Sequence, residues 1–135
     1  MMERLLYVDS SALVKLVLAE PESAALRRFI SDREHLVSSA VAAVEVVRAA
    51  RRASRSKKVA SQARNVVRAV HLLAVDLKVL ERAAELAPPT LRSLDAIHLA
   101  SALSLEEDIE AMVVYDDRLA AAARSSGLSV VSPTV

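Results

Sequence analysis

Short apolar runs alternate with longer stretches of helical periodicity along the whole chain. Each short run closes on a polar residue, which is typical of a strand buried on both faces of a sheet. The predicted strands cover residues 5–8, 36–37, 72–75, 112–115 and 129–131, and the predicted helices cover residues 10–19, 23–30, 41–52, 56–69, 77–86, 93–105 and 117–126. This alternation predicts an α/β fold with a mainly parallel central sheet flanked by helices, in one domain over residues 1–135.

The composition removes several classes of site from consideration. The chain has 135 residues and no cysteine, which excludes disulfides and thiolate metal centres. A single glycine excludes Gly-rich phosphate loops, and the few aromatic residues argue against a platform for base stacking. Because no apolar segment is long enough to span a membrane and the first residues lack a signal-peptide pattern, we expect a cytoplasmic protein.

Basic residues gather in one stretch, although the formal net charge is only +1. Residues 46–75 contain no acid, and their lysines and arginines are Arg48, Arg51, Arg52, Arg55, Lys57, Lys58, Arg64 and Arg68. Such a stretch forms either a solvated helix face or a surface that binds a phosphate backbone, and the pattern leaves both open.

Four acidic residues stand where a lone charge is unexpected. Asp9 and Asp116 directly follow strand-like runs, so they belong at the carboxyl edge of the sheet, where open parallel sheets bind ligands. Glu45 and Asp95 lie among apolar neighbours in predicted helices. Each acid has an ordinary alternative, as a helix cap or, for Glu45, as the partner of Arg48. Together they predict a carboxylate cluster for a hard divalent cation, Mg²⁺ or Mn²⁺.

Four motifs around these acids resemble those of the PIN-domain family, and especially its VapC-type toxins. They are YVDSSALVKL at 7–16, VEVVR at 44–48, LDAIHLA at 94–100 and VYDDRL at 114–119. Their order and spacing agree with the family over nearly the whole chain. The family often has Thr or Ser two residues before its last acid, where this chain has Val114.

The resemblance implies a PIN-like fold and an endoribonuclease that cleaves single-stranded or looped RNA with Mg²⁺ or Mn²⁺. It also implies the toxin role in a VapBC-type toxin–antitoxin pair, with a VapB-type antitoxin as partner, and a homodimer. We expect the dimer contact on apolar surface of the helices over residues 11–52. The implied catalytic and metal-binding residues are Asp9, Glu45, Asp95 and Asp116, supported by Ser11, Lys15 and Asp117. Asp116 takes the acidic role because Asp117 is then free to cap the last helix.

The basic stretch supplies the expected substrate contacts. We expect Arg48, Arg51, Arg52 and Arg55 to bind RNA phosphates, with Arg48 best placed because it lies one turn beyond Glu45. His98, one turn after Asp95, is expected to make a structural hydrogen bond rather than to act in catalysis.

Two other functions remain open at this stage. One is a catalytically silent PIN-like domain that only binds or regulates a partner. The other is a receiver-like signalling domain that accepts a phosphoryl group in an acidic pocket. Receiver-like domains usually open with adjacent acids on the first strand, whereas Asp9 stands alone here.

Overall fold

Strands and helices alternate along the chain in the computed structural model, which describes residues 4–134. The strands are β1 (Leu5–Val8), β2 (Leu36–Ser39), β3 (His71–Leu73), β4 (Ile109–Val113) and β5 (Val130–Val131). The helices are α1 (Ser10–Val14), α2 (Ser23–Ile30), α3 (Ala42–Ala53), α4 (Lys57–Arg68), α5 (Leu77–Glu85), α6 (Ser93–Leu103) and α7 (Asp117–Ser125). Within this described part, none of the helices is long and apolar enough to cross a membrane.

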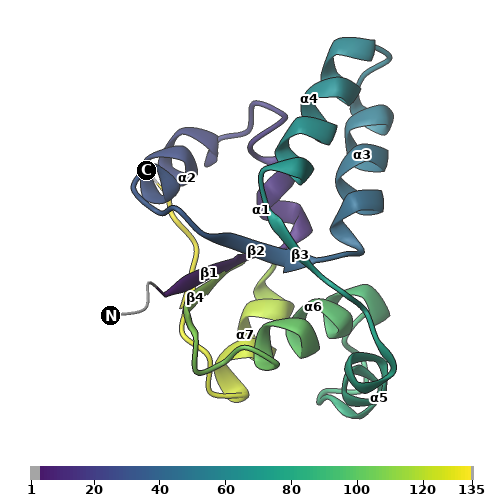
Figure 1. The fold of residues 1–135 in the computed structure, drawn as a ribbon, viewed down its shortest axis with the longest axis vertical. Coiled ribbons are helices and arrows are strands. Elements are labelled where there is room, and N and C mark those ends of the chain that lie inside the picture. Colours follow the sequence, from purple (N-terminus) through teal and green to yellow (C-terminus); the bar gives the residue numbers. More distant parts are fainter. Residues whose placement is uncertain (1–3, 135) are drawn as a thin grey trace.

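The sheet is parallel and its strand order changes direction at the centre. The order is β3-β2-β1-β4-β5, and the paired strands all run parallel. The chain starts with β1, adds β2 and β3 on one side, and then returns to add β4 and β5 on the other (Figure 1). The predicted α/β class with a parallel sheet is confirmed. In such sheets a ligand crevice lies beyond the carboxyl ends of the two strands where the direction changes, here β1 and β4.

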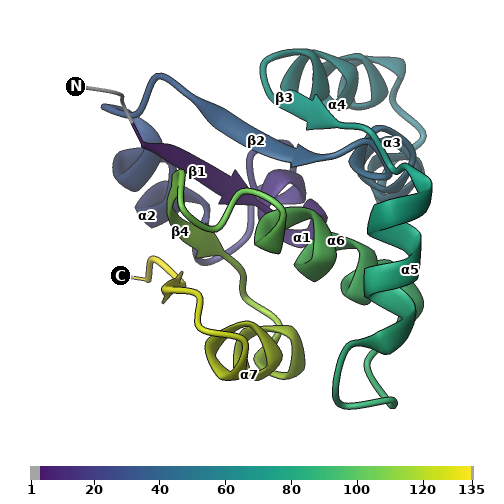
Figure 2. The same cartoon turned by 60° about the horizontal axis from the view of Figure 1, so that its bottom comes forward.

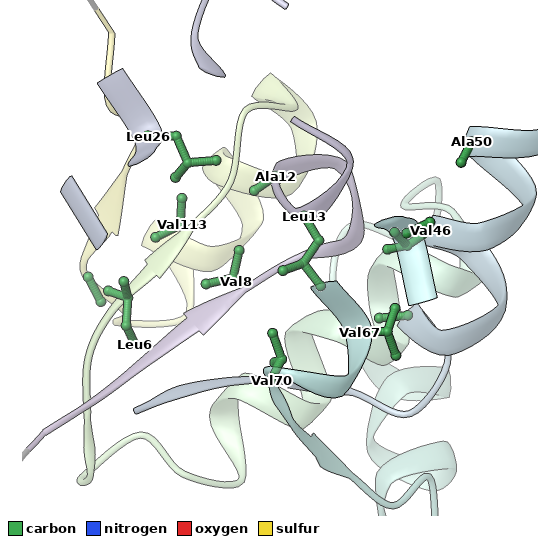
Figure 3. Close-up of a cluster of buried hydrophobic side chains, with 13 residues drawn as sticks. Leu6, Val8, Ala12, Leu13, Leu26, Val46, Ala50, Val67, Val70 and Val113 are labelled. Atoms are coloured by element: carbon green, nitrogen blue, oxygen red, sulfur yellow. The ribbon is translucent and has the colours of Figure 1, made fainter. Parts of the chain in front are cut away.

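Helices cover both faces of the sheet, α1 to α4 on one and α5 to α7 on the other (Figures 1 and 2). Successive residues of β1 point to opposite faces. Leu6 and Val8 join the buried cluster beneath α1, α3 and α4 that Figure 3 shows, whereas Tyr7 joins a second cluster with Leu99 and Leu119. Because both faces of β1 are buried, the residues that follow Val8 are held on a rigid support.

The basic stretch forms a helical hairpin. Helices α3 and α4 lie against each other and extend beyond the sheet (Figure 1). Their contact face is small and apolar, with Val46, Ala50, Ala63 and Val67 buried. These spacings of about one helical turn leave the basic side chains on the outer faces, where most of them are exposed.

Several element boundaries differ from the sequence prediction, and two of them, in β4 and α1, adjoin the acids. The strand expected at 112–115 is β4, which begins at Ile109 because Ile109 and Ala111 pair with β1. Two residues therefore separate β4 from Asp116. The first helix ends at Val14 rather than near residue 19, because the next backbone hydrogen bonds, such as Lys15 N to Ala12 O, span three residues and form turns.

Candidate active site

The crevice beyond β1 and β4 gathers the four predicted carboxylates from both layers of the fold. Asp9 directly follows β1, and its amide donates to the Val113 carbonyl of β4 at 3.2 Å. Asp116 follows β4, Glu45 lies in the first turn of α3 and Asp95 in the first turn of α6. Burial, and then the charges of Asp116 and Glu45, raise the pKa of Asp95. The acids thus lie close enough to repel one another.

Asp9 is the most enclosed of the four. Its side chain is 3% exposed, and its Oδ1 accepts a hydrogen bond from the Ala12 amide at 2.9 Å. The Ser11 hydroxyl lies 3.0 Å from Oδ1 and 2.9 Å from Oδ2. Burial raises the pKa of Asp9 to about 6, although the bonds from Ala12 and Ser11 favour the ionised form. Asp9 therefore caps α1, the ordinary role that the sequence left open for it, and the Ser11 hydroxyl bonds its carboxylate.

A chain of hydrogen bonds holds the Glu45 carboxylate. The Ser10 hydroxyl donates to Glu45 Oε1 at 2.7 Å, and His98 Nε2 lies 2.8 Å from the same oxygen. His98 Nδ1 lies 2.7 Å from the Tyr7 hydroxyl. Burial raises the pKa of Glu45, but the hydrogen bonds from His98 and Ser10 outweigh it, so the pKa lies below its ordinary value. The partners of Glu45 are thus Ser10 and His98 rather than Arg48.

Neither Ser10 nor Tyr7 is among the site residues that the sequence predicted. Ser10 follows Asp9 at the expected start of a helix, and Tyr7 lies within an apolar strand-like run. The available signal was His98, a polar side chain within an apolar helix, because a buried imidazole needs partners. Its expected structural hydrogen bond is confirmed, and those partners are Tyr7, Ser10 and Glu45.

Asp116 caps α7, whereas the sequence predicted this role for Asp117. Asp116 Oδ1 accepts a hydrogen bond from the Leu119 amide at 2.9 Å, so Asp116 itself caps α7. Asp117 is the first residue of α7 and is exposed. The prediction that Asp117 is the cap was wrong, because β4 ends earlier and α7 begins one residue after Asp116. The charge of Asp116 nevertheless acts on Asp95.

Two hollows in the surface meet at Asp116. The first has a volume of about 470 Å³ and is lined by Ser10, Ser11, Val14, Lys15, Glu20, Glu45, Ala49, Arg52, Tyr115 and Asp116. The second has a volume of about 320 Å³ and is lined by Thr90, Leu91, Arg92, Asp95, Asp116, Asp117 and Arg118. Glu45 lines the first hollow and Asp95 the second, so Asp116, which lines both, lies at the boundary between them.

The predicted substrate arginines separate onto three surfaces. Arg52 lines the first hollow with Glu45. Arg48 instead lines a groove between α3 and α4, beside Val44 and Arg64, and Arg51 and Arg55 line a third depression at the α3–α4 turn. Seven residues bring a helix nearly back to the same face, whereas three residues stop about 60° short of a full turn. Arg52 therefore faces the acids, and Arg48 does not.

Lys15 lies in the first hollow but already has partners. Its Nζ is 2.9 Å from Glu22 Oε2 and 3.7 Å from Glu20 Oε1, and it lies 4.7 Å from the centre of the Tyr115 ring. Its side chain is 11% exposed. This pairing ties the turn after α1 to the start of α2, so Lys15 shapes the wall of the hollow.

The four carboxylates match a hard divalent cation in the chemistry of their donors. Such an ion takes oxygen ligands, and it would relieve the repulsion from Asp116 and Glu45 that adds to burial in raising the pKa of Asp95. Within residues 4–134, no three His, Cys, Asp or Glu side chains lie close enough together to form a ready metal site. Asp9 and Asp116 are turned to helix amides and Glu45 to His98, so the carboxylates would have to rotate to share an ion.

Comparison with known proteins assigns the family. The PIN domain model matches residues 6–125. Ribonuclease VapC46 from Mycobacterium tuberculosis is 46% identical over 129 residues, covering 96% of this chain and 98% of that protein. Ribonuclease VapC35 from the same organism is 39% identical over 96% of this chain and 97% of that protein, and Ribonuclease VapC47 is 35% identical with the same coverage.

The fold also matches a solved structure. The crystal structure of Mycobacterium tuberculosis VapC20, described as a sarcin-ricin loop cleaving toxin, superposes with a TM-score of 0.75 over 95% of this chain and 99% of that chain. The two sequences are 17% identical, so this likeness concerns the fold. The family match also decides against a receiver-like domain. With its parallel sheet, its acids at the β1–β4 crevice and these relatives, the chain belongs to the PIN-domain family, among the VapC ribonucleases.

Proposed function

We propose that this ribonuclease cleaves single-stranded or looped RNA with Mg²⁺ or Mn²⁺, as the toxin of a VapBC-type toxin–antitoxin pair. The observation that carries the proposal is the meeting of Asp9, Glu45, Asp95 and Asp116 at the β1–β4 crevice, with the pKa of Asp95 raised by burial and by Asp116 and Glu45. A bound divalent cation would supply an activated water and neutralise charge on the phosphate.

The chain's own residues would orient that site. Ser11 and the Ala12 amide hold Asp9, while Ser10 and His98 hold Glu45. These partners keep the two carboxylates at the crevice, where a bound ion would turn them toward itself. Asp95 and Asp116 complete the acidic set from the opposite layer of helices. Asp117 and Lys15 support the two walls of the site, one at the start of α7 and the other beside Tyr115.

The substrate would be held by arginines. Arg52 is the predicted arginine that shares a hollow with Glu45 and Asp116, whereas Arg48, Arg51 and Arg55 line surfaces outside that hollow and would not contact the strand at the acids. VapC20, which has the same fold, is described as cleaving the sarcin-ricin loop, so an RNA hairpin with that loop is the first structured substrate to test.

A VapB-type antitoxin is the proposed partner, since its cations would find the same acids. A homodimer would use helices within residues 11–52, where Val44 is a large apolar side chain that is 61% exposed. We further propose that the chain acts as one domain over residues 1–135 in the cytoplasm, where its RNA substrate and antitoxin would be met.

The test is cleavage of the loop hairpin and of unstructured RNA by the purified chain with Mg²⁺, Mn²⁺ or EDTA. We expect discrete products with either metal and none with EDTA. Asp95→Asn is the matched inactive variant, and its expression should fail to arrest growth where the wild type does. RNA binding without cleavage under every condition would instead support the catalytically silent PIN-like domain, and cleavage in EDTA would overturn metal dependence.

A further inference from the structure

The second hollow contains two arginines beside the acids, Arg92 and Arg118. Arg92 is the residue before α6, three positions from Asp95, and Arg118 is the second residue of α7, two positions from Asp116. Both line the hollow with these two acids. Each arginine therefore lies at the start of a helix, within three residues of an acid of the site.

Both arginines are available to a ligand. Arg92 and Arg118 are exposed, and among residues 4–134 neither takes part in an ion pair. The charge of Arg92 still lowers the pKa of Asp95, although burial and neighbouring acids have the larger, opposite effect. The guanidinium thus acts at the acidic cluster without being bound by it. A guanidinium in this state suits a phosphate, which it binds through paired N–H donors.

The first hollow offers the counterpart on the other side of Asp116. Lys15 there is engaged with Glu20 and Glu22, which leaves Arg52 as the cation of that hollow without an ion pair in the described chain. The acids at the boundary therefore have free arginines on both sides. An RNA strand with its scissile phosphate at the acids would carry further phosphates over both hollows.

We propose that the RNA backbone crosses Asp116 from one hollow to the other, with Arg92 and Arg118 binding phosphates on the side opposite to Arg52. This assignment rests on the proposed ribonuclease function. It identifies the surface that binds the RNA phosphates on the far side of the acids from Arg52. The hollow of about 320 Å³ is lined mostly by polar and charged side chains, as suits binding of a phosphate backbone, and no base-specific contact is required.

The experiment compares Arg92→Gln/Arg118→Gln with the control Arg82→Gln/Arg124→Gln. The control removes the same charge from exposed arginines in the last turns of α5 and α7, outside both hollows. Binding of a fluorescently labelled oligouridine is followed by anisotropy in EDTA over a range of KCl, so the readout does not depend on catalysis. Circular dichroism and thermal melting verify that each variant is folded.

Each single-strand phosphate contact contributes about 0.7 to the log–log salt slope. Relative to 1 M salt, where this contribution vanishes, one contact therefore raises the affinity at 0.1 M salt about fivefold. The double variant should therefore flatten the slope by about 1.4 and lose about 25-fold in affinity, while the control stays within about twofold of the wild type. Arg92→Lys/Arg118→Lys should retain most of the slope. Adding Arg52→Gln should lower the slope further by an independent increment, because the two hollows contact different phosphates.

An unchanged slope in the Gln double variant, with wild type that binds and cleaves RNA, would overturn this assignment and leave the proposed function intact. Equal losses in the control would also overturn it, because they would show a general charge effect. A wild-type chain that neither binds nor cleaves RNA would overturn both.

Discussion

The Tyr7 hydroxyl, on β1, lies 2.7 Å from Nδ1 of His98, on α6, and this contact determines how His98 meets the acidic site. Burial holds the pKa of Tyr7 well above its ordinary value, so its hydroxyl stays protonated. The ionised Glu45 carboxylate can only accept a hydrogen bond from His98, so Nδ1 of a neutral imidazole accepts the hydrogen bond from Tyr7. The proton of a neutral imidazole then sits on Nε2, which faces Glu45 Oε1 at 2.8 Å. A core tyrosine thereby sets the tautomer that orients a carboxylate of the site.

The first prediction concerns Tyr7→Phe. The ring and its packing are retained, but His98 Nδ1 loses its donor in a buried position. A buried acceptor left without a partner costs about 1 to 3 kcal/mol, so the free energy of unfolding should fall by that amount. Urea denaturation measures it. Tyr115→Phe is the control, because that hydroxyl bonds the Pro133 carbonyl at a partly exposed position and its loss should cost less. Equal effects in both variants would contradict the role of the buried contact.

The order of the strands and helices and the protein family could both be predicted from the sequence, because both depend on local patterns. The apolar run that ends at Asp9 indicated that Asp9 lies at the carboxyl edge of the sheet, and it does. The same reasoning misplaced the end of β4. Val114 is as apolar as the strand residues before it, and only pairing with β1 shows that the strand begins at Ile109 and ends at Val113.

The hydrogen-bond partners of the acids could not be predicted, because they come from elements far apart in the chain. Ser10 and Glu45 are separated by 35 positions, and Tyr7 and His98 by 91. Periodicity assigns a side chain to a face, but the meeting of two faces at a sheet edge depends on the tertiary fold. For the same reason sequence distance favoured Arg48, whereas the helix turn brings Arg52 to the acids.

The second prediction concerns pH. The pKa of Asp9 is about 6 in the folded protein against an ordinary value of 3.8. Between these values the folded state holds a proton that the unfolded chain has released. The stabilisation that comes from protonated Asp9 is therefore fully present below pH 3.8 and is lost as the pH rises to about 6. A gap of this size corresponds to about 3 kcal/mol.

Asp9→Asn removes this titration and keeps a side chain that can cap α1. In metal-free buffer, the fall in unfolding free energy between about pH 4 and pH 6 should be smaller in the variant by up to about 3 kcal/mol. Urea denaturation at a series of pH values measures the difference. Asp76→Asn, which replaces the exposed cap of α5, should follow the wild-type profile. An identical profile in Asp9→Asn would show that Asp9 does not carry the effect.

The third prediction separates catalysis from folding. Asp9→Asn, Asp95→Asn and Asp116→Asn should each lower RNA cleavage by at least about 100-fold, because each removes a charged oxygen from the cluster. Metal-free stability should be unchanged or higher, since repulsion is relieved. Mn²⁺ should raise the melting temperature of the wild type more than that of these variants, by the linkage of binding to folding. Asp117→Asn should stay near wild type in all three measurements. An essential Asp117 with a dispensable Asp116 would move the assignment by one residue.

The last prediction compares two arginines of one helix. Arg52 lies seven residues beyond Glu45 and lines the hollow that contains it, whereas Arg48 lies three residues beyond and faces the α3–α4 groove. Arg52→Gln should therefore weaken binding of single-stranded RNA about fivefold at 0.1 M salt and flatten the log–log salt slope by about 0.7. Arg48→Gln, an equal loss of charge on the same helix, should leave the slope unchanged. Neither variant should alter the Mn²⁺-induced rise in melting temperature, because neither residue bonds a carboxylate of the site. A salt slope that falls in Arg48→Gln but not in Arg52→Gln would place the RNA along the outer face of the hairpin, away from the first hollow.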